Sequence, residues 1–334
     1  MSMLENNQTA LREIQFFQAL QEALSEEMER DPRVFVMGED IGVFGGIYGV
    51  TRGLLERFGG QRVIDTPISE SGLTGTALGA AMTGGRPVLE IMYMDFLTQS
   101  LDQLVNHAAK VRYMSGGQVR VPLVIRTQGG VSGLEGAQHS QLLEGWFVHV
   151  PGLKVVCPFT AADAKGLLKA AIRDDNPVVF IEHRALYFTK GHVPTGEHLV
   201  PLGKANVLRP GRDVTIVTYA RMCEVALQAA NDLAQTNIDA EIIDLRTLAP
   251  LDMATVIESV KKTHRALILE EDVKTGGVGA EIFTQIVENA FDYLDAPLKR
   301  IAGRDVPAPA APNLEPLVIP RKENVVESVR ELFG

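Results

Sequence analysis

Residues 62–91 read RVIDTPISESGLTGTALGAAMTGGRPVLEI, and this stretch decides the fold class of the chain. It begins and ends with short, largely unalternating apolar runs, Arg62–Asp65 and Pro87–Ile91. Runs of this kind are typical of strands that are buried on both faces of a parallel sheet. The segment between them predicts a helix, so the stretch forms a strand–helix–strand unit and indicates an α/β fold.

The same alternation continues on both sides of this unit. An amphipathic helix is predicted from Thr9 to Arg30, and Asp31-Pro32 ends it because proline disfavours a helical conformation of the preceding residue. Further strands are predicted at Val34–Met37, Val121–Arg126, Lys154–Val156 and Pro177–Glu182, and a further helix at Ala161–Arg173. The first half of the chain therefore predicts a doubly wound sheet.

A second set of alternating elements follows residues 189–212, where three prolines and four glycines interrupt the pattern. Its predicted strands are Asp213–Tyr219, Glu241–Leu245, Ala266–Glu270 and Leu298–Ile301, with helices that begin near Cys223, Met253 and Gly279. A proline-rich segment, Val306–Pro320, precedes a last predicted helix at Val325–Leu332. Because 334 residues suffice for two domains, we expect two doubly wound domains.

Composition narrows the class of protein. The 32 basic and 42 acidic side chains give a net charge of −10, whereas a general nucleic-acid binder needs a dense basic face. Only two cysteines occur, Cys157 and Cys223, which excludes a disulfide framework and favours a reducing compartment. No apolar run reaches the roughly 20 residues that span a bilayer, and the first residues do not resemble a signal or transit peptide. We expect a soluble, cytoplasmic protein.

Glu70 is the first candidate for chemistry. It stands in the first turn of the predicted helix, at the carboxyl end of a strand, where open α/β sheets place their ligands. The exposed side of this helix consists of glycines, each of which costs up to about 1 kcal/mol relative to alanine; they are Gly72, Gly75, Gly79 and Gly84. Close approach of another backbone or of a flat ligand would compensate this cost. The pattern alone leaves open whether Glu70 acts on a ligand or only complements the helix dipole.

His139, in the run GAQHSQ at residues 136–141, is the second candidate, since a histidine on a glycine-rich loop can transfer protons near neutral pH. A structural role for a lone histidine is the more common alternative. Ser140 beside it does not lie in a G-x-S-x-G elbow, so a serine hydrolase is disfavoured. The runs at residues 38–46 and 277–282 match no nucleotide-binding fingerprint, which argues against an NAD-dependent dehydrogenase. The acidic pairs Glu26/Glu27 and Glu270/Glu271 are expected to be solvated.

These motifs together resemble one family. The runs that carry the resemblance are spread from Met37 to Ile282, and they are MGEDIGVFGGIYGVTRGL, RVIDTPISESGLTG, GAAMTGGRPVLEIM, QLVNHAAKVRYMSGG, GAQHSQ, PGLKVVCP, DAKGLLKAAIRDDNP and EEDVKTGGVGAEI. They are similar to β subunits of the thiamine-diphosphate-dependent decarboxylating component of 2-oxo acid dehydrogenase complexes, of the pyruvate type first and the acetoin type close behind. The resemblance implies a transketolase-like pyrimidine-binding domain at residues 1–190, a linker at 191–206 and a transketolase C-terminal domain at 207–334.

The resemblance also implies roles for individual residues. Glu70 corresponds to the glutamate that hydrogen-bonds the aminopyrimidine and activates the cofactor, and His139 to a histidine that transfers protons during acyl transfer to lipoamide. Met92, Phe96 and Gln99 correspond to positions that line the aminopyrimidine, with Phe96 stacked on the ring. A structural potassium site of some family members corresponds to Leu123, Ala171, Ile172, Asp174 and Asn176.

The partners follow from a motif that the chain lacks. No G-D-G followed by a downstream Asn, the family's magnesium–diphosphate signature, occurs in it. The resemblance therefore implies that magnesium and the diphosphate bind to a separate α subunit, in a heterotetramer of two α and two β chains, with a lipoyl-bearing dihydrolipoyl acyltransferase as the further partner. Ala137-Gln138 argues against branched-chain substrates, while pyruvate and acetoin, and a non-catalytic interaction subunit of the same fold, stay open.

Overall fold

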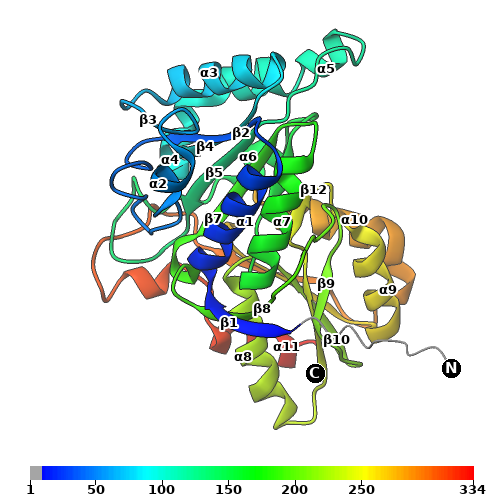
Figure 1. Ribbon diagram of the computed structural model, residues 1–334. Coiled ribbons are helices and arrows are strands. Elements are labelled where there is room, and N and C mark those ends of the chain that lie inside the picture. Colours follow the sequence, from blue (N-terminus) through cyan, green and yellow to red (C-terminus); the bar gives the residue numbers. More distant parts are fainter. Residues whose placement is uncertain (1–9) are drawn as a thin grey trace, which may run out of the picture.

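The computed structural model describes residues 10–334, and its first half is built on a seven-stranded sheet (Figure 1). The strand order is β12-β6-β7-β5-β4-β2-β3. The strands are β2 (Val34–Gly38), β3 (Val63–Asp65), β4 (Arg86–Ile91), β5 (Val124–Gly129), β6 (Lys154–Val156), β7 (Val178–His183) and β12 (Thr247–Ala249). All neighbouring pairs are parallel except β12 and β6. The predicted doubly wound sheet is confirmed.

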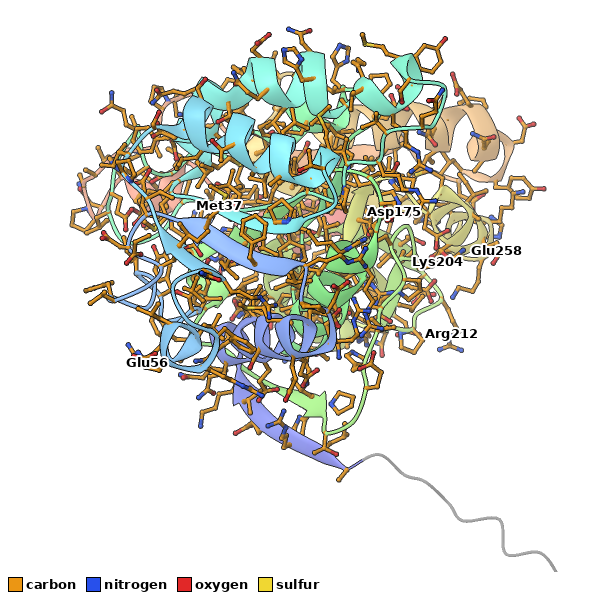
Figure 2. The ribbon with its side chains drawn as sticks, turned by 45° about the horizontal axis from the view of Figure 1, so that its top comes forward. Met37, Glu56, Asp175, Lys204, Arg212 and Glu258 are labelled. Atoms are coloured by element: carbon orange, nitrogen blue, oxygen red, sulfur yellow. The ribbon has the colours of Figure 1, made fainter. Side chains whose placement is uncertain are left out.

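Helices cover both faces of this sheet. Neighbouring residues of β4, Val88 and Leu89, belong to different hydrophobic cores, which explains why the strand sequence does not alternate. One face packs against α1 (Phe16–Arg30) and α7 (Ala161–Arg173), and the other against α3 (Glu70–Met82) and α6 (Glu144–Val148). In Figure 2, Met37 of β2 lies inside the molecule beneath α3, whereas the charged side chain of Glu56 stands at the surface.

The second half forms a five-stranded sheet of order β14-β13-β10-β11-β9. Its strands are β9 (Asn206–Arg209), β10 (Val214–Thr218), β11 (Ala240–Asp244), β13 (Ala266–Val273) and β14 (Lys299–Gly303). Helices α8 (Met222–Ala234) and α11 (Lys322–Arg330) cover one face, and α9 (Met253–Thr263) and α10 (Val278–Ala290) cover the other. The alternation predicted for residues 213–301 is therefore confirmed.

The two halves share a core. One hydrophobic cluster contains Leu73 of α3 and Phe147 of α6 together with Val260 of α9 and Ile282 of α10. Strand β12, which belongs to the second half in sequence, adds to the first sheet by pairing with β6. The halves consequently pack as one body, and the loops that follow their strands face each other.

The helix predicted from Thr9 to Arg30 is too long. Thr9 lies outside the described residues, and β1 (Leu11–Gln15) is a strand that pairs antiparallel with β8 (Lys190–Pro194). Leu11 is 62% exposed, so the buried helical stripe begins only at Phe16. Tertiary pairing with β8 thus outweighs the local helical pattern of residues 11–15.

Other boundaries also differ from the sequence-based prediction; for example, the strand predicted at Ala266–Glu270 continues to Val273. The strand predicted at Val121–Arg126 begins at Val124, because Pro122 has no N–H to give to a sheet and residues 121–123 run irregularly. The last helix spans Lys322–Arg330 instead of Val325–Leu332. No helix among residues 10–334 is long and apolar enough to cross a membrane.

Candidate active site

Two carboxyl groups meet at the carboxyl edge of the first sheet. Glu70 is the first residue of α3, and it is buried at 6% exposure. Glu39 follows β2, the strand that pairs with β3, the strand before Glu70. Burial first, and then the charge of Glu70, raise the pKa of Glu39. Its Oε1 is buried without a hydrogen-bond partner among the described residues, so this edge holds a polar atom ready for a ligand.

The segment after β4 lies beside α3. It contains α4 (Met94–Leu97) and the 3-10 turn Thr98–Ser100. The Thr74 hydroxyl, one turn after Glu70, donates to the Ser100 hydroxyl at 2.8 Å and ties the two elements together. Met92 and Phe96 are half-buried, and Gln99 is exposed. The residues that the sequence assigns to the aminopyrimidine therefore stand next to the helix that carries Glu70.

His139 lies on the loop after β5 and contacts the same segment. Its ring meets Phe96 edge to face with 5.4 Å between centroids, and Tyr93 with 5.6 Å. Asp95, which is buried, accepts hydrogen bonds from the backbone and the side-chain amide of Gln141, at 3.2 and 2.9 Å. The structure thus brings His139 and Phe96 together, as a single site requires.

Three residues of this site were missed by the sequence analysis: Glu39, Tyr93 and Asp95. Glu39 lies inside the run MGEDIGVFGGIYGVTRGL that carries the family resemblance, and Tyr93 and Asp95 follow the run that ends at Met92, but neither their spacing nor their residue type distinguishes them. Their contacts depend on the order of the strands in space. Only the pairing of β2 with β3, and of β4 with β5, brings them next to Glu70 and His139.

The residues assigned to potassium lie around a loop whose carbonyl oxygens bind the guanidinium group of Arg86. The Arg86 guanidinium donates to the carbonyl oxygens of Ile172 and Asp174, at 2.9 and 2.7 Å. The Leu123 carbonyl accepts from the backbone of Val178 at 2.9 Å, and the Asp174 carboxylate forms an ion pair with Lys154. A carbonyl oxygen has two lone pairs, so these bonds leave one on each oxygen for a metal ion. The carbonyl oxygens therefore fit a potassium ion, but this ion would lie next to the positively charged Arg86 guanidinium.

Three of the four residues in the acidic pairs are buried, against the prediction that they are solvated, whereas Glu26 is half-exposed. Glu27 has no exposed surface and bonds Arg30 and Arg173. Glu270 has none either; it accepts from the backbone of Gly279 at 2.8 Å and pairs with Arg300. A Cβ at Gly279 would collide with the Glu270 carboxylate, which explains the glycine-rich start of α10 without a nucleotide.

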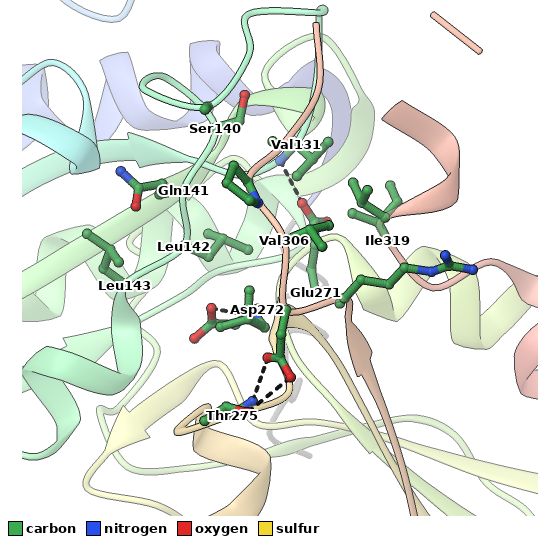
Figure 3. A pocket seen from close by; sticks show the side chains of 18 of the residues that line it. Val131, Ser140, Gln141, Leu142, Leu143, Glu271, Asp272, Thr275, Val306 and Ile319 are labelled. Carbon is green, nitrogen blue, oxygen red and sulfur yellow. Dashed lines mark hydrogen bonds between the residues drawn. The ribbon is translucent and has the colours of Figure 1, made fainter. Parts of the chain in front are cut away.

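A cavity of about 530 Å³ lies behind the His139 loop (Figure 3). Its walls come from the loop and from the segments after β13 and β14, and include Ser140, Leu142, Asp272, Val306 and Ile319. Glu70 does not line it. The cavity therefore lies between residues of the two halves, beside the candidate site, and is distinct from the place where the aminopyrimidine is expected.

The fold and the family comparisons define the class of protein. The transketolase pyrimidine-binding domain matches residues 12–190, and the transketolase C-terminal domain matches residues 203–325. A split-gene transketolase, described as an inactive β4 tetramer, superposes with a TM-score of 0.78 at 22% identity, over 96% of this chain and 98% of that one. The chain is thus a two-domain protein of the transketolase fold.

Closer relatives are more specific. The pyruvate dehydrogenase E1 component β subunit of Rickettsia felis is 51% identical over 94% of this chain and 97% of its own length. The corresponding β subunit of Rhizobium meliloti is 51% identical over 94% of this chain and 68% of its own length. The mitochondrial β-2 subunit of Oryza sativa is 49% identical over 96% of this chain and 86% of its own length. The chain belongs to the family of pyruvate dehydrogenase E1 component β subunits.

Proposed function

We propose that this chain, together with an α subunit, catalyses the thiamine-diphosphate-dependent oxidative decarboxylation of pyruvate. It then transfers the acetyl group to a lipoyl group on a dihydrolipoyl acyltransferase. The observation that carries the proposal is the placement of buried Glu70 and of the Phe96–His139 pair at one edge of the sheet, in a chain about half identical to β subunits of this enzyme.

Each residue has one task in this proposal. Thiamine diphosphate, when bound, supplies the electron sink for loss of the carboxylate. Glu70 holds and returns one proton at a ring nitrogen of the aminopyrimidine, for which a buried carboxyl group is suited. Met92 and Phe96 pack against the ring, and Gln99 gives it a polar contact. The unpartnered Oε1 of Glu39 beside Glu70 supports a polar ligand at this place.

An α subunit completes the site. Large apolar side chains near Glu70 are exposed, namely Val43 (88%), Phe44 (66%), Ile47 (46%) and Ile68 (76%). The backbone N–H of Val43 donates to Asp65 at 3.1 Å, so this loop lies at the end of β3, directly before α3. A Cβ at Gly79 on α3 would meet no atom within 4 Å among the described residues. Exposed apolar surface of this kind marks a protein interface, and we assign it to the α subunit, which would also hold magnesium and the diphosphate.

Several further assignments belong to the proposal. His139 transfers the proton that accompanies passage of the acetyl group to the lipoyl sulfur. Potassium binds at the carbonyls of Leu123, Ala171, Ile172, Asp174 and Asn176 and raises thermal stability, an effect that an equal concentration of sodium should not reproduce. The domain boundaries are 1–190 and 207–334, and the compartment is the cytoplasm, in which the buried thiols Cys157 and Cys223 stay reduced.

The test is reconstitution with the α subunit. The purified heteromer, supplied with thiamine diphosphate, magnesium and an artificial electron acceptor, is assayed with pyruvate, acetoin and branched-chain 2-oxo acids. Pyruvate should be oxidised with the highest kcat/KM. Preference for acetoin would make the chain an acetoin-type β subunit. Binding to the α subunit without turnover of any substrate would support a non-catalytic role and contradict the proposal.

A further inference from the structure

The loop that carries His139 is held by buried charged groups to which the proposed mechanism gives no role. The loop spans residues 130–143 and connects β5 to α6. Flexible glycines at Gly130, Gly133 and Gly136 have positive φ, so their backbone alone does not fix the place of His139. The charged groups, Arg184 and Glu271, come from two different parts of the chain.

Arg184, from the first half of the chain, binds the loop through hydrogen bonds and an ion pair. Its side chain is 3% exposed. One terminal nitrogen donates to the Gly130 carbonyl at 2.7 Å and to the Ser140 hydroxyl at 3.2 Å, and the other forms an ion pair with Glu135. The guanidinium also lies 5.2 Å from the centre of the Tyr93 ring, which is the ring that His139 meets edge-on. Arg184 therefore binds the beginning, middle and end of the loop and supports its contact surface.

Glu271, from the second half of the chain, binds the loop at Val131, as Figure 3 shows. Its carboxylate accepts from the Val131 N–H at 2.7 Å, and Arg221 donates to the Val131 carbonyl at 3.0 Å. His183 completes the arrangement. Its Nδ1 accepts from the Ala185 N–H at 3.2 Å, so Nε2 carries the proton and donates it to Glu271 at 3.0 Å.

The charge state of Glu271 suits its hydrogen bond to the loop. Burial raises the pKa of Glu271, but the interactions with His183 and Arg221 and the hydrogen bond from the Val131 N–H outweigh burial, so the pKa lies below its ordinary value. Glu271 is thus a carboxylate at neutral pH and a strong acceptor for the loop amide. Glu270 next to it is equally buried, yet its partners Gly279 and Arg300 are in the second half only.

We infer that Arg184 and Glu271 are positioning residues for His139 in the acyl-transfer half-reaction. This inference rests on the proposed function. Neither residue contacts the segment assigned to the aminopyrimidine except through Tyr93, so decarboxylation should not depend on them. A displacement of about 1 Å of a catalytic group can cost roughly 100-fold in rate. The rate of acyl transfer should therefore fall when either Arg184 or Glu271 no longer binds the loop.

The experiment measures two activities of the same α–β heteromer. Decarboxylation is followed with an artificial electron acceptor, and acetylation with a free lipoyl domain. Arg184→Met should lower kcat for lipoyl acetylation roughly 10- to 100-fold with little change in KM, and leave the artificial-acceptor rate within about twofold. Arg184→Lys should recover part of the loss, since it keeps the charge but not the planar fork.

Glu271→Gln and Glu270→Gln form the matched pair. Only Glu271→Gln should lower lipoyl acetylation selectively, because only Glu271 contacts the loop. Combined with His139→Ala, neither Arg184→Met nor Glu271→Gln should lower acetylation further. Equal loss of both activities, additive loss in the double variants, or no loss would overturn the inference alone. A wild-type heteromer that is inactive in both assays would overturn the proposed function and the inference with it.

Discussion

Phe96 and His139 meet edge to face, with 5.4 Å between their ring centroids and an interplanar angle of 75°. The two residues lie on the loops that follow β4 and β5, which are neighbours in the sheet. The side chain assigned to the aminopyrimidine thus touches the side chain assigned to acyl transfer. In the proposed function, the two half-reactions therefore use adjacent side chains of one site.

Glu70→Gln should lower decarboxylation by the reconstituted heteromer roughly 10²- to 10⁴-fold, the usual scale for general acid–base catalysis. The amide cannot give and retake the proton at the ring nitrogen. Binding to the α subunit should persist because the shape of the side chain is kept. Glu281→Gln is the control, since Glu281 is also in the first turn of a helix but is exposed. Wild-type turnover of the Glu70 variant would remove this residue from the mechanism.

Arg126→Met should lower stability far more than Arg120→Met. Arg126 is fully buried and bonds Glu182 at 2.7 and 2.8 Å and Glu90 at 2.5 Å. Its loss leaves two buried carboxylates without a cation, at a cost of about 3–5 kcal/mol. Arg120 pairs with Asp175 at 2.8 Å but its side chain is 67% exposed, so its loss should cost less than about 1 kcal/mol. Chemical unfolding of the three proteins measures the difference; equal effects would contradict it.

Stability should fall as the pH rises toward 7 because of Asp272. Burial first, and then the charge of Glu270, raise the pKa of Asp272 to about 7, and burial and Asp272 raise the pKa of Glu144. An aspartate in the unfolded chain titrates near pH 4, at about 3.9. Between about pH 4 and 7 the native state therefore holds a proton that the unfolded chain has lost, so stability decreases as the pH increases through this window.

Asp272→Asn removes this titration. The gain in the midpoint of thermal unfolding over wild type should therefore be larger at pH 8 than at pH 5. Asp292→Asn, at an exposed position, serves as the control and should shift the midpoint equally at both values. A gain for Asp272→Asn that does not depend on pH would show that the buried carboxyl group does not titrate as described.

The fold was largely predictable because burial on both faces leaves a strong signal in the strands. Lys154–Val156 and Ala161–Arg173 have the predicted bounds, since each ends at a proline or a charged turn. Residues 11–15 were predicted as helix because their local pattern is helical. Their pairing with Lys190–Pro194 depends on a contact far along the chain, which no local pattern contains.

The site was predictable only where the family resemblance names a residue. Glu70 and His139 stand in runs that carry it, Phe96 follows such a run by four residues, and the structure places Phe96 and His139 in contact. Glu271 was expected to be solvated because acidic side chains usually are. Its burial follows from the packing of the second half against the His139 loop, through His183 and Val131. The contacts of Arg184 could not be predicted from the sequence pattern around it, because its partners are spread over residues 93–140.

The central claim, that this chain supplies the activating carboxyl group while a partner binds the diphosphate, is tested most directly by calorimetric titration with thiamine diphosphate and magnesium. The purified chain alone should bind the cofactor with a Kd weaker than about 1 mM, and addition of the α subunit should tighten binding by far more than tenfold, or 1.4 kcal/mol. Tight binding by the chain alone, accompanied by turnover of pyruvate, would contradict the account.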